Sequence, residues 1–215
     1  LKYSVMNNFI KKNKIVGRTV LVMIIFGVFF STILEFVYTN ANPIIIKSEA
    51  EAKERLLLQV ISKDIYNNDL INSFIEILPN QKLKNNVTIK AYIAKKDSKV
   101  TAVILETRAP NGYSGEIKIL VGIDTKGYIL GTRVVKHQET PGLGDYIDVT
   151  KSDWINIFTY SSLKNTSQSE WAVKKDQGKF DYVSGATITA RAVVNAINES
   201  LNFFKENKLE MGIDV

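Results

Sequence analysis

Asp181-Tyr182-Val183-Ser184-Gly185-Ala186-Thr187-Ile188-Thr189 is the stretch at which irregular sequence gives way to a helical pattern. After it, apolar side chains recur at steps of three and four and predict one apolar helix face: Ala192, Val193, Ala196, Ile197, Leu201 and Phe204. Either Ser184 or Thr187 is expected to cap this helix, because a hydroxyl oxygen accepts hydrogen bonds from free N–H groups of the first turn. The stretch therefore predicts a glycine turn followed by a helix that packs on a core.

A helix start of this kind has two interpretations. Hydroxyl residues and glycine before a helix commonly serve as caps and turns, with no ligand involved. A helix N-terminus also concentrates free N–H donors and the positive end of the helix dipole, which together favour a phosphate or another anion. The residues alone leave both interpretations open.

Size and composition set the broad class of protein. A chain of 215 residues is long enough for one compact domain with appendages. Its 45% apolar and 23% charged residues argue against disorder, and it contains no repeat or low-complexity tract. We therefore expect one folded domain.

The distribution of charge argues against a nucleic-acid-binding surface. The net charge is +6, but five of the 28 basic residues lie within the first 18 positions, where no acidic residue occurs. The remainder of the chain carries 23 basic against 22 acidic side chains and is nearly neutral.

With no cysteine and one histidine, the sequence also predicts no disulfide and no metal site.

The segment Thr19–Tyr38 predicts a transmembrane helix. Its residues are predominantly apolar, with Glu35 as the single charge, and twenty helical residues span about 30 Å, the thickness of a bilayer core. The basic leader 1–18 places the N-terminus in the cytoplasm by the positive-inside rule, which puts residues 39–215 on the extracytoplasmic side. A cleaved signal peptide, with Thr39-Asn40-Ala41 as the cleavage site, and a buried soluble helix are the weaker alternatives.

The rest of the chain predicts an α+β domain. Asn42-Pro43 is expected to stop the first helix, and Glu49–Ile61 reads as an amphipathic helix that packs Leu56, Leu57, Val60 and Ile61 inward. The segment Ile71–Leu78 is apolar but matches neither a helix nor a strand clearly. Alternation and short turns then predict four strands of an antiparallel sheet with helices on one face: Val87–Ile93, Val100–Thr107, Glu116–Ile123 and Tyr128–Lys136.

The hexapeptide Ser184-Gly185-Ala186-Thr187-Ile188-Thr189 resembles the flavinylation motif Ser/Thr-Gly-Ala-Thr-x-Ser/Thr. This motif belongs to the FMN-binding domain family, which is found in the G subunit of Rnf (or Rsx) complexes and the C subunit of sodium-pumping NADH:quinone reductases. The resemblance implies that FMN is bound covalently to Thr189 as a phosphoryl threonine, with the other motif residues around it. Asp181 fits the longer pattern that a flavin transferase recognises.

A second resemblance supports the first. His137-Gln138-Glu139-Thr140-Pro141-Gly142-Leu143-Gly144 matches the family signature His-x-Glu-Thr-Pro-Gly-Leu-Gly, and Gly112-Tyr113-Ser114-Gly115 resembles its Gly-Tyr-x-Gly element. The resemblance implies a flavin pocket lined by Glu139, Thr140, Leu143 and Gly144. His137 is expected to be a hydrogen-bonded structural residue. Trp154 and Trp171 are expected in the core, with shielding of the flavin ring as the alternative.

The resemblance covers nearly the whole chain and implies an electron-transfer subunit of a membrane-bound, ion-translocating Rnf/Rsx-type complex, a translocase. Its partners would be other membrane subunits, membrane lipid and a flavin transferase, because no residue near Thr189 is expected to be a base that could activate its hydroxyl. No catalytic residue and no independent turnover are expected. The alternatives are the C subunit of a sodium-pumping reductase, a membrane-anchored module that binds a phosphorylated ligand non-covalently, and a purely structural subunit.

Overall fold

The computed structural model describes residues 2–81, 83 and 85–213. Its first element is the helix α1 (Lys2–Val60), and the chain divides into two compact units, residues 1–51 and 52–215. In the first unit the large apolar side chains from Val16 to Ile46 are exposed to the surroundings. By length and composition, the helix between Val16 and Val60 contains a segment that can cross a membrane once.

The predicted helix stop at Asn42-Pro43 is wrong, because α1 continues through Pro43 without interruption. Proline lacks one N–H group, but its φ angle is compatible with a helix. Apolar residues on both sides of Pro43 extend the helix, and long membrane-type helices tolerate a proline at the cost of one hydrogen bond.

The second unit is built on one antiparallel sheet with the strand order β1-β2-β3-β4-β5. The four predicted strands are confirmed with ends shifted by up to three residues, and the unassigned segment Ile71–Leu78 contains the remaining strand. The strands are β1 (Phe74–Ile77), β2 (Ile89–Lys96), β3 (Lys99–Ala109), β4 (Ile117–Asp124) and β5 (Ile129–Lys136). The β4–β5 hairpin closes as predicted, with the Gly127 N–H donating to the Asp124 carbonyl.

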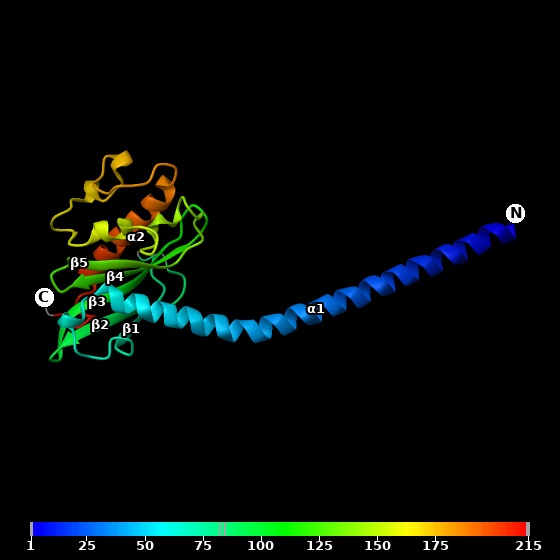
Figure 1. The fold of residues 1–215 in the computed structure, drawn as a ribbon, viewed down its shortest axis with the longest axis horizontal. Helices are drawn as coiled ribbons and strands as arrows, with labels where there is room; N and C mark the ends of the chain where they lie inside the picture. The colour runs from blue at the N-terminus through cyan, green and yellow to red at the C-terminus, as the bar shows by residue number, and fades with distance from the viewer. Residues whose placement is uncertain (1, 82, 84, 214–215) are drawn as a thin grey trace. The chain divides into compact units, whose positions relative to one another are not determined.

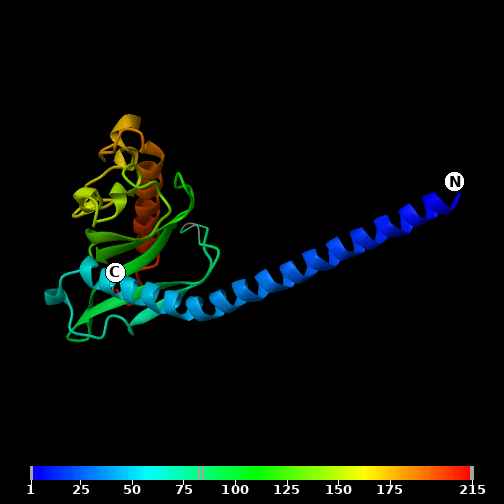
Figure 2. The same ribbon diagram turned by 45° about the vertical axis from the view of Figure 1, so that its right-hand side comes forward.

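Helix α2 (Thr187–Glu206) covers one face of this sheet, and the end of α1 lies on the other (Figures 1 and 2). All six residues of the predicted apolar face of α2 are buried in the larger core cluster. On the opposite face Leu57, Val60 and Ile61 are buried against the sheet, and Leu56 is half-buried, as predicted. The sheet is therefore covered on both faces.

Between β5 and α2 the chain forms short 3₁₀ helices: η2 (Asp145–Ile147), η3 (Asp153–Phe158), η4 (Gln168–Glu170) and η5 (Lys174–Asp176); η1 (Lys63–Ile65) follows α1. Trp154 and Trp171 from this region are buried, and Phe158 and Phe180 lie between them in a series of ring contacts. The expectation that both tryptophans belong to the core is confirmed.

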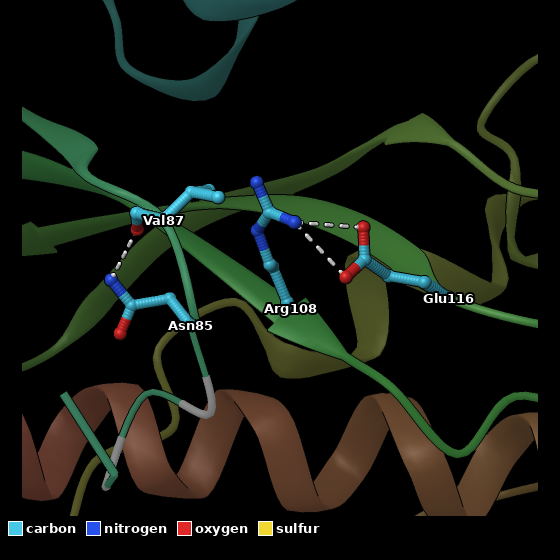
Figure 3. A network of polar contacts seen from close by, with 4 residues as sticks. All are labelled: Asn85, Val87, Arg108 and Glu116. Atoms are coloured by element: carbon cyan, nitrogen blue, oxygen red, sulfur yellow. Dashed lines mark hydrogen bonds and ion pairs between the residues drawn. The ribbon is translucent and has the colours of Figure 1, made fainter. Parts of the chain in front are cut away.

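An ion pair joins the last residues of β3 to the residue before β4, and so closes the loop that connects these two strands. The Arg108 Nη1 donates to both carboxylate oxygens of Glu116 at 3.0 Å (Figure 3). Beside this pair, Asn85 donates to the Val87 carbonyl at 2.9 Å and orders the segment that leads into β2. The intervening loop, 110–116, is the first of three segments that build the site described next.

Candidate functional site

The N-terminus of α2 is the second segment of the site, and it has no side-chain cap. Thr187 is the first helical residue, and Ala186 occupies the N-cap position, so the expected capping by Ser184 or Thr187 is wrong. A capping hydroxyl must come from the residue directly before the helix. Gly185 has a φ of +90° and turns the chain, leaving the Ser184 side chain exposed.

This first turn of α2 also contains no acidic residue. Its free N–H groups and the positive end of the helix dipole are therefore not compensated by a side chain of the turn itself. Such a helix start favours an anion at the position of the first turn. Thr189 is the third residue of the helix and lies in this turn.

The Thr189 hydroxyl is bonded to the third segment, the turn that follows β5. Thr189 Oγ1 donates to Glu139 Oε2 at 2.5 Å, across fifty residues of sequence. Both side chains are buried, with 1% of Thr189 and 4% of Glu139 exposed. The sequence predicts no base near Thr189 that is strong enough to activate its hydroxyl; the fold brings a carboxylate from the turn after β5 within hydrogen-bond distance of it.

Glu139 is held from several sides. The Ser114 N–H of the loop 110–116 donates to Glu139 Oε1 at 3.1 Å, so each carboxylate oxygen accepts one hydrogen bond. The backbone N–H of Glu139 donates to His137 Nδ1 at 3.1 Å, which confirms a structural, hydrogen-bonded role for His137. The carboxylate thus has a fixed position between two loops and α2.

Two glycines make room for this carboxylate. A Cβ on Gly144 would lie 2.7 Å from Glu139 Oε2 and 3.3 Å from Thr189 Oγ1, and a Cβ on Gly112 would lie 2.8 Å from Glu139 Oε1. Distances below about 3 Å are shorter than carbon–oxygen contacts permit. Any side chain at Gly144 would therefore press on the contact between Glu139 and Thr189.

The structure brings both sequence motifs into one site. The turn at 140–144 is closed by the N–H groups of Leu143 and Gly144, which donate to the Thr140 carbonyl at 3.1 and 3.0 Å. A Cβ on Gly185 would lie 3.2 Å from Leu143 Cδ1, so this turn packs on the start of the motif. The Thr140 and Leu143 side chains are exposed, whereas Ala186 and Thr187 are buried.

Sequence reasoning included Ser114 in a motif without predicting its contact with Glu139, and it did not single out Tyr146. Ser114 contributes only its backbone N–H, for which no side-chain pattern exists. Tyr146 is buried, and its hydroxyl has no hydrogen-bond partner within the described part of the chain. Burial raises the pKa of Tyr146 to about 12, and the negative charge of Glu139 adds to this rise. The backbone N–H of Val183 opposes the rise, although it does not meet the geometry of a hydrogen bond.

Comparison with known proteins covers the same part of the chain. Residues 112–202, which include Glu139 and Thr189, match the family of FMN-binding domains. The described residues contain no group of acidic, histidine or cysteine side chains suited to a metal ion. The fold is also similar to the crystal structure of Shewanella oneidensis NqrC, with 22% sequence identity, a TM-score of 0.47, and coverage of 71% of this chain and 74% of that one.

Curated relatives extend over most of the chain. It is similar to the protein from Haemophilus influenzae, strain ATCC 51907, that is named as the G subunit of the ion-translocating oxidoreductase complex, with 52% identity over 160 residues. These residues make up 74% of this chain and 75% of that protein. The protein of the same name from Pseudomonas aeruginosa, strain UCBPP-PA14, is 42% identical over 171 residues, which are 80% of this chain and 79% of that protein.

Proposed function

The chain belongs to the family of G subunits of ion-translocating oxidoreductase complexes and has an FMN-binding domain, and from this premise we propose that it carries FMN covalently on Thr189. In this role it is an electron-transfer subunit of a membrane complex. Bound FMN supplies the chemistry, since its ring accepts and releases one or two electrons. The chain supplies the attachment point and the surroundings.

The observation that carries this proposal is the position of the Thr189 hydroxyl in the uncapped first turn of α2. A phosphoester at this hydroxyl would have its negative charge beside free N–H groups and the positive end of the helix dipole. The helix start therefore suits the phosphate of FMN, whereas the Glu139 carboxylate beside this hydroxyl would repel it unless Glu139 is protonated or displaced. Attachment through the phosphate leaves the flavin ring unmodified, so its electron chemistry is preserved.

The proposed membrane arrangement is based on the apolar segment of α1 and the basic residues before it. Residues 19–38 are proposed to cross the inner membrane once, in contact with lipid, with the basic leader 1–18 in the cytoplasm. Residues 39–215 would then lie on the periplasmic side, where the flavin exchanges electrons with other membrane subunits of the complex. A covalent bond prevents loss of the flavin into that compartment.

Attachment is proposed to require a separate flavin transferase. Forming a phosphoester needs an activated phosphoryl donor, which must be bound and oriented. Asp181, which the transferase pattern includes, is exposed and forms an ion pair with Lys174 at 2.6 Å. It is therefore accessible to a protein that binds the motif.

The test is covalent fluorescence after co-expression with a transferase. The full chain should fluoresce under ultraviolet light on a denaturing gel, and Thr189→Ala should lose this signal completely. Ser200→Ala is the matched control, because it removes another buried hydroxyl of α2, outside the motif, and should keep the signal. A fluorescent Thr189→Ala band would refute the attachment site.

Comparison of the native protein with the denaturing gel separates the other candidate functions. Colour that is present in the native protein but lost on denaturation would support a non-covalent phosphate-ligand module. A colourless protein in the presence of the transferase would support a purely structural subunit. The names of the curated relatives favour the G subunit of an ion-translocating complex over the C subunit of a sodium-pumping reductase.

A further inference from the structure

We propose that Glu139 is the general base for the attachment of FMN, accepting the proton of the Thr189 hydroxyl as the phosphoester forms. This inference rests on the proposed function, and it assigns to the acceptor chain a catalytic role in its own modification. A transferase would then supply the activated flavin phosphate, while Glu139 of this domain would supply the base.

The geometry of the pair meets the first requirement of a general base. A base must lie within hydrogen-bond reach of the proton that it accepts. Thr189 Oγ1 already donates its proton to Glu139 Oε2 at 2.5 Å, with both groups buried from water. The proton of the hydroxyl is therefore directed at the carboxylate, and its oxygen is the atom that would bond to phosphorus.

The second requirement concerns the charges around the carboxylate. Among the described residues, the ion pairs involve other carboxylates, and no lysine, arginine or histidine pairs with Glu139. A paired cation would stabilise the ionised carboxylate and weaken its hold on a proton. The second carboxylate oxygen accepts from the neutral Ser114 N–H, which fixes the group without adding a full positive charge.

The step balances as a phosphoryl transfer with no change in oxidation state. Thr189 Oγ forms a bond to the phosphorus of a flavin 5′-phosphate that is activated as a phosphoanhydride. The anhydride P–O bond breaks, and its electron pair leaves with the departing phosphate group. The hydroxyl proton goes to Glu139 Oε2, so a neutral, weakly nucleophilic threonine never has to ionise alone.

Access to the hydroxyl requires movement of the turn 140–144, because the Thr189 side chain is buried beneath it. Two hydrogen bonds hold Glu139 from outside that turn. Its carboxylate is held by Ser114 and its backbone N–H by His137, both outside the turn. The turn can therefore open toward the transferase while Glu139 stays beside Thr189.

The experiment measures the rate of attachment to the purified, detergent-solubilised full chain, with transferase and its flavin donor, across a range of pH. Mass spectrometry of the peptide that contains Thr189 reports the modified fraction. We expect Glu139→Gln to react about 100-fold more slowly, within the range that general-base catalysis contributes. Its rate should also lose the fall at low pH that protonation of a carboxylate causes in the wild-type chain.

Glu106→Gln is the matched control, because Glu106 is another poorly exposed carboxylate that accepts a hydroxyl hydrogen bond, from Tyr92. It should react at the wild-type rate. Glu139→Asp keeps a carboxylate but shortens its reach, and should fall between wild type and Glu139→Gln while keeping the fall at low pH. This second variant keeps the test decisive if Glu139→Gln does not fold, as judged by circular dichroism.

The possible failures are distinguishable. A Glu139→Gln chain that reacts at the wild-type rate, or a Glu139→Asp chain that does so without a fall at low pH, would overturn the role of Glu139 and leave FMN on Thr189 intact. A wild-type chain that never gains the mass of FMN on this peptide would overturn the proposed function itself.

Discussion

Two carboxylates, Glu106 on β3 and Glu139 in the turn after β5, each accept a hydrogen bond from a hydroxyl, and their other partners differ. Glu106 accepts from Tyr92 at 3.0 Å and also from the Lys53 ammonium at 2.5 Å. Glu139 accepts from Thr189 at 2.5 Å and from a neutral backbone N–H. Among the described residues, Glu106 has a cation partner, whereas the donors to Glu139 are a hydroxyl and a backbone N–H.

This difference separates a structural contact from a reactive one. Lys53 lies near the end of α1, so its ion pair with Glu106 links that helix to β3 and neutralises a poorly exposed charge. Burial raises the pKa of Tyr92, and the charge of Glu106 adds to the effect, so the phenol keeps its proton. At Glu139 the hydrogen-bond donors are neutral, which leaves the carboxylate able to accept the proton of Thr189.

The largest expected effect comes from moving Glu139 away from Thr189. In Gly144→Ala the new methyl group would lie 2.7 Å from Glu139 Oε2, and the end of a flexible side chain can move aside without unfolding the domain. We expect attachment of FMN to slow by about 10- to 100-fold, because displacements of about 1 Å have effects of this size. The attachment rate and the melting temperature of the full chain should be measured together.

Gln138→Ala is the control for this change, since it alters an exposed side chain directly beside Glu139 in the sequence. It should attach FMN at the wild-type rate. A Gly144→Ala chain that attaches FMN as fast as Gln138→Ala would show that the position of Glu139 is not important for the reaction.

An intermediate effect is expected on the other carboxylate. Lys53→Met removes the cation and leaves Glu106, whose side chain is 19% exposed, with a negative charge and no cation partner. The pair is partly exposed, so we expect a loss of about 1–2 kcal/mol in the free energy of unfolding, between values for surface and buried pairs. The loss should appear as a lower melting temperature, with no change in attachment of FMN.

The second substitution Glu106→Gln, made in the Lys53→Met chain, should restore part of this stability, because it removes the unpaired charge. No restoration in the double variant would mean that Lys53 acts through the packing of its methylene groups. That result would remove the basis of the comparison between the two carboxylates.

The sequence predicted the elements of this fold better than the contacts between them. Alternation of side chains located β2 to β5, and spacing of three and four identified the buried face of α2, because both patterns are local. The short strand β1 was not assigned, since four residues are too few to show a period. Pro43 was misread because local rules for proline ignore the long apolar helix around it.

The candidate site shows the same limit. Motifs identified Thr189 and Glu139 separately, and the assignment of FMN to Thr189 stays a prediction. Their contact joins positions fifty residues apart, which no spacing rule covers. The predicted caps at Ser184 and Thr187 are wrong because the turn at Gly185 sets the start of α2 one residue beyond Ala186. The ends of helices are the part of a sequence prediction that is least well determined.

The smallest expected effect concerns a third carboxylate, Asp176, which is well exposed and paired with Arg191, two residues beyond Thr189 on α2. Hydrogen bonding to Arg191 lowers the pKa of Asp176 below its ordinary value of 3.8; partial desolvation opposes this, and the positive charge of Arg191 adds to it. A carboxylate with a lower pKa in the folded state stabilises that state above its unfolded pKa, and loses this contribution as the pH falls through the folded value.

Asp176→Asn should therefore melt slightly below wild type at pH 7, and the difference should disappear as the pH falls below 3.8. Salt should reduce the difference as well, because the pair is exposed, and attachment of FMN should be unchanged. A difference that persists at low pH, or slower attachment, would show that this exposed pair positions the first turn of α2 and that Glu139 is not the only carboxylate on which the reaction depends.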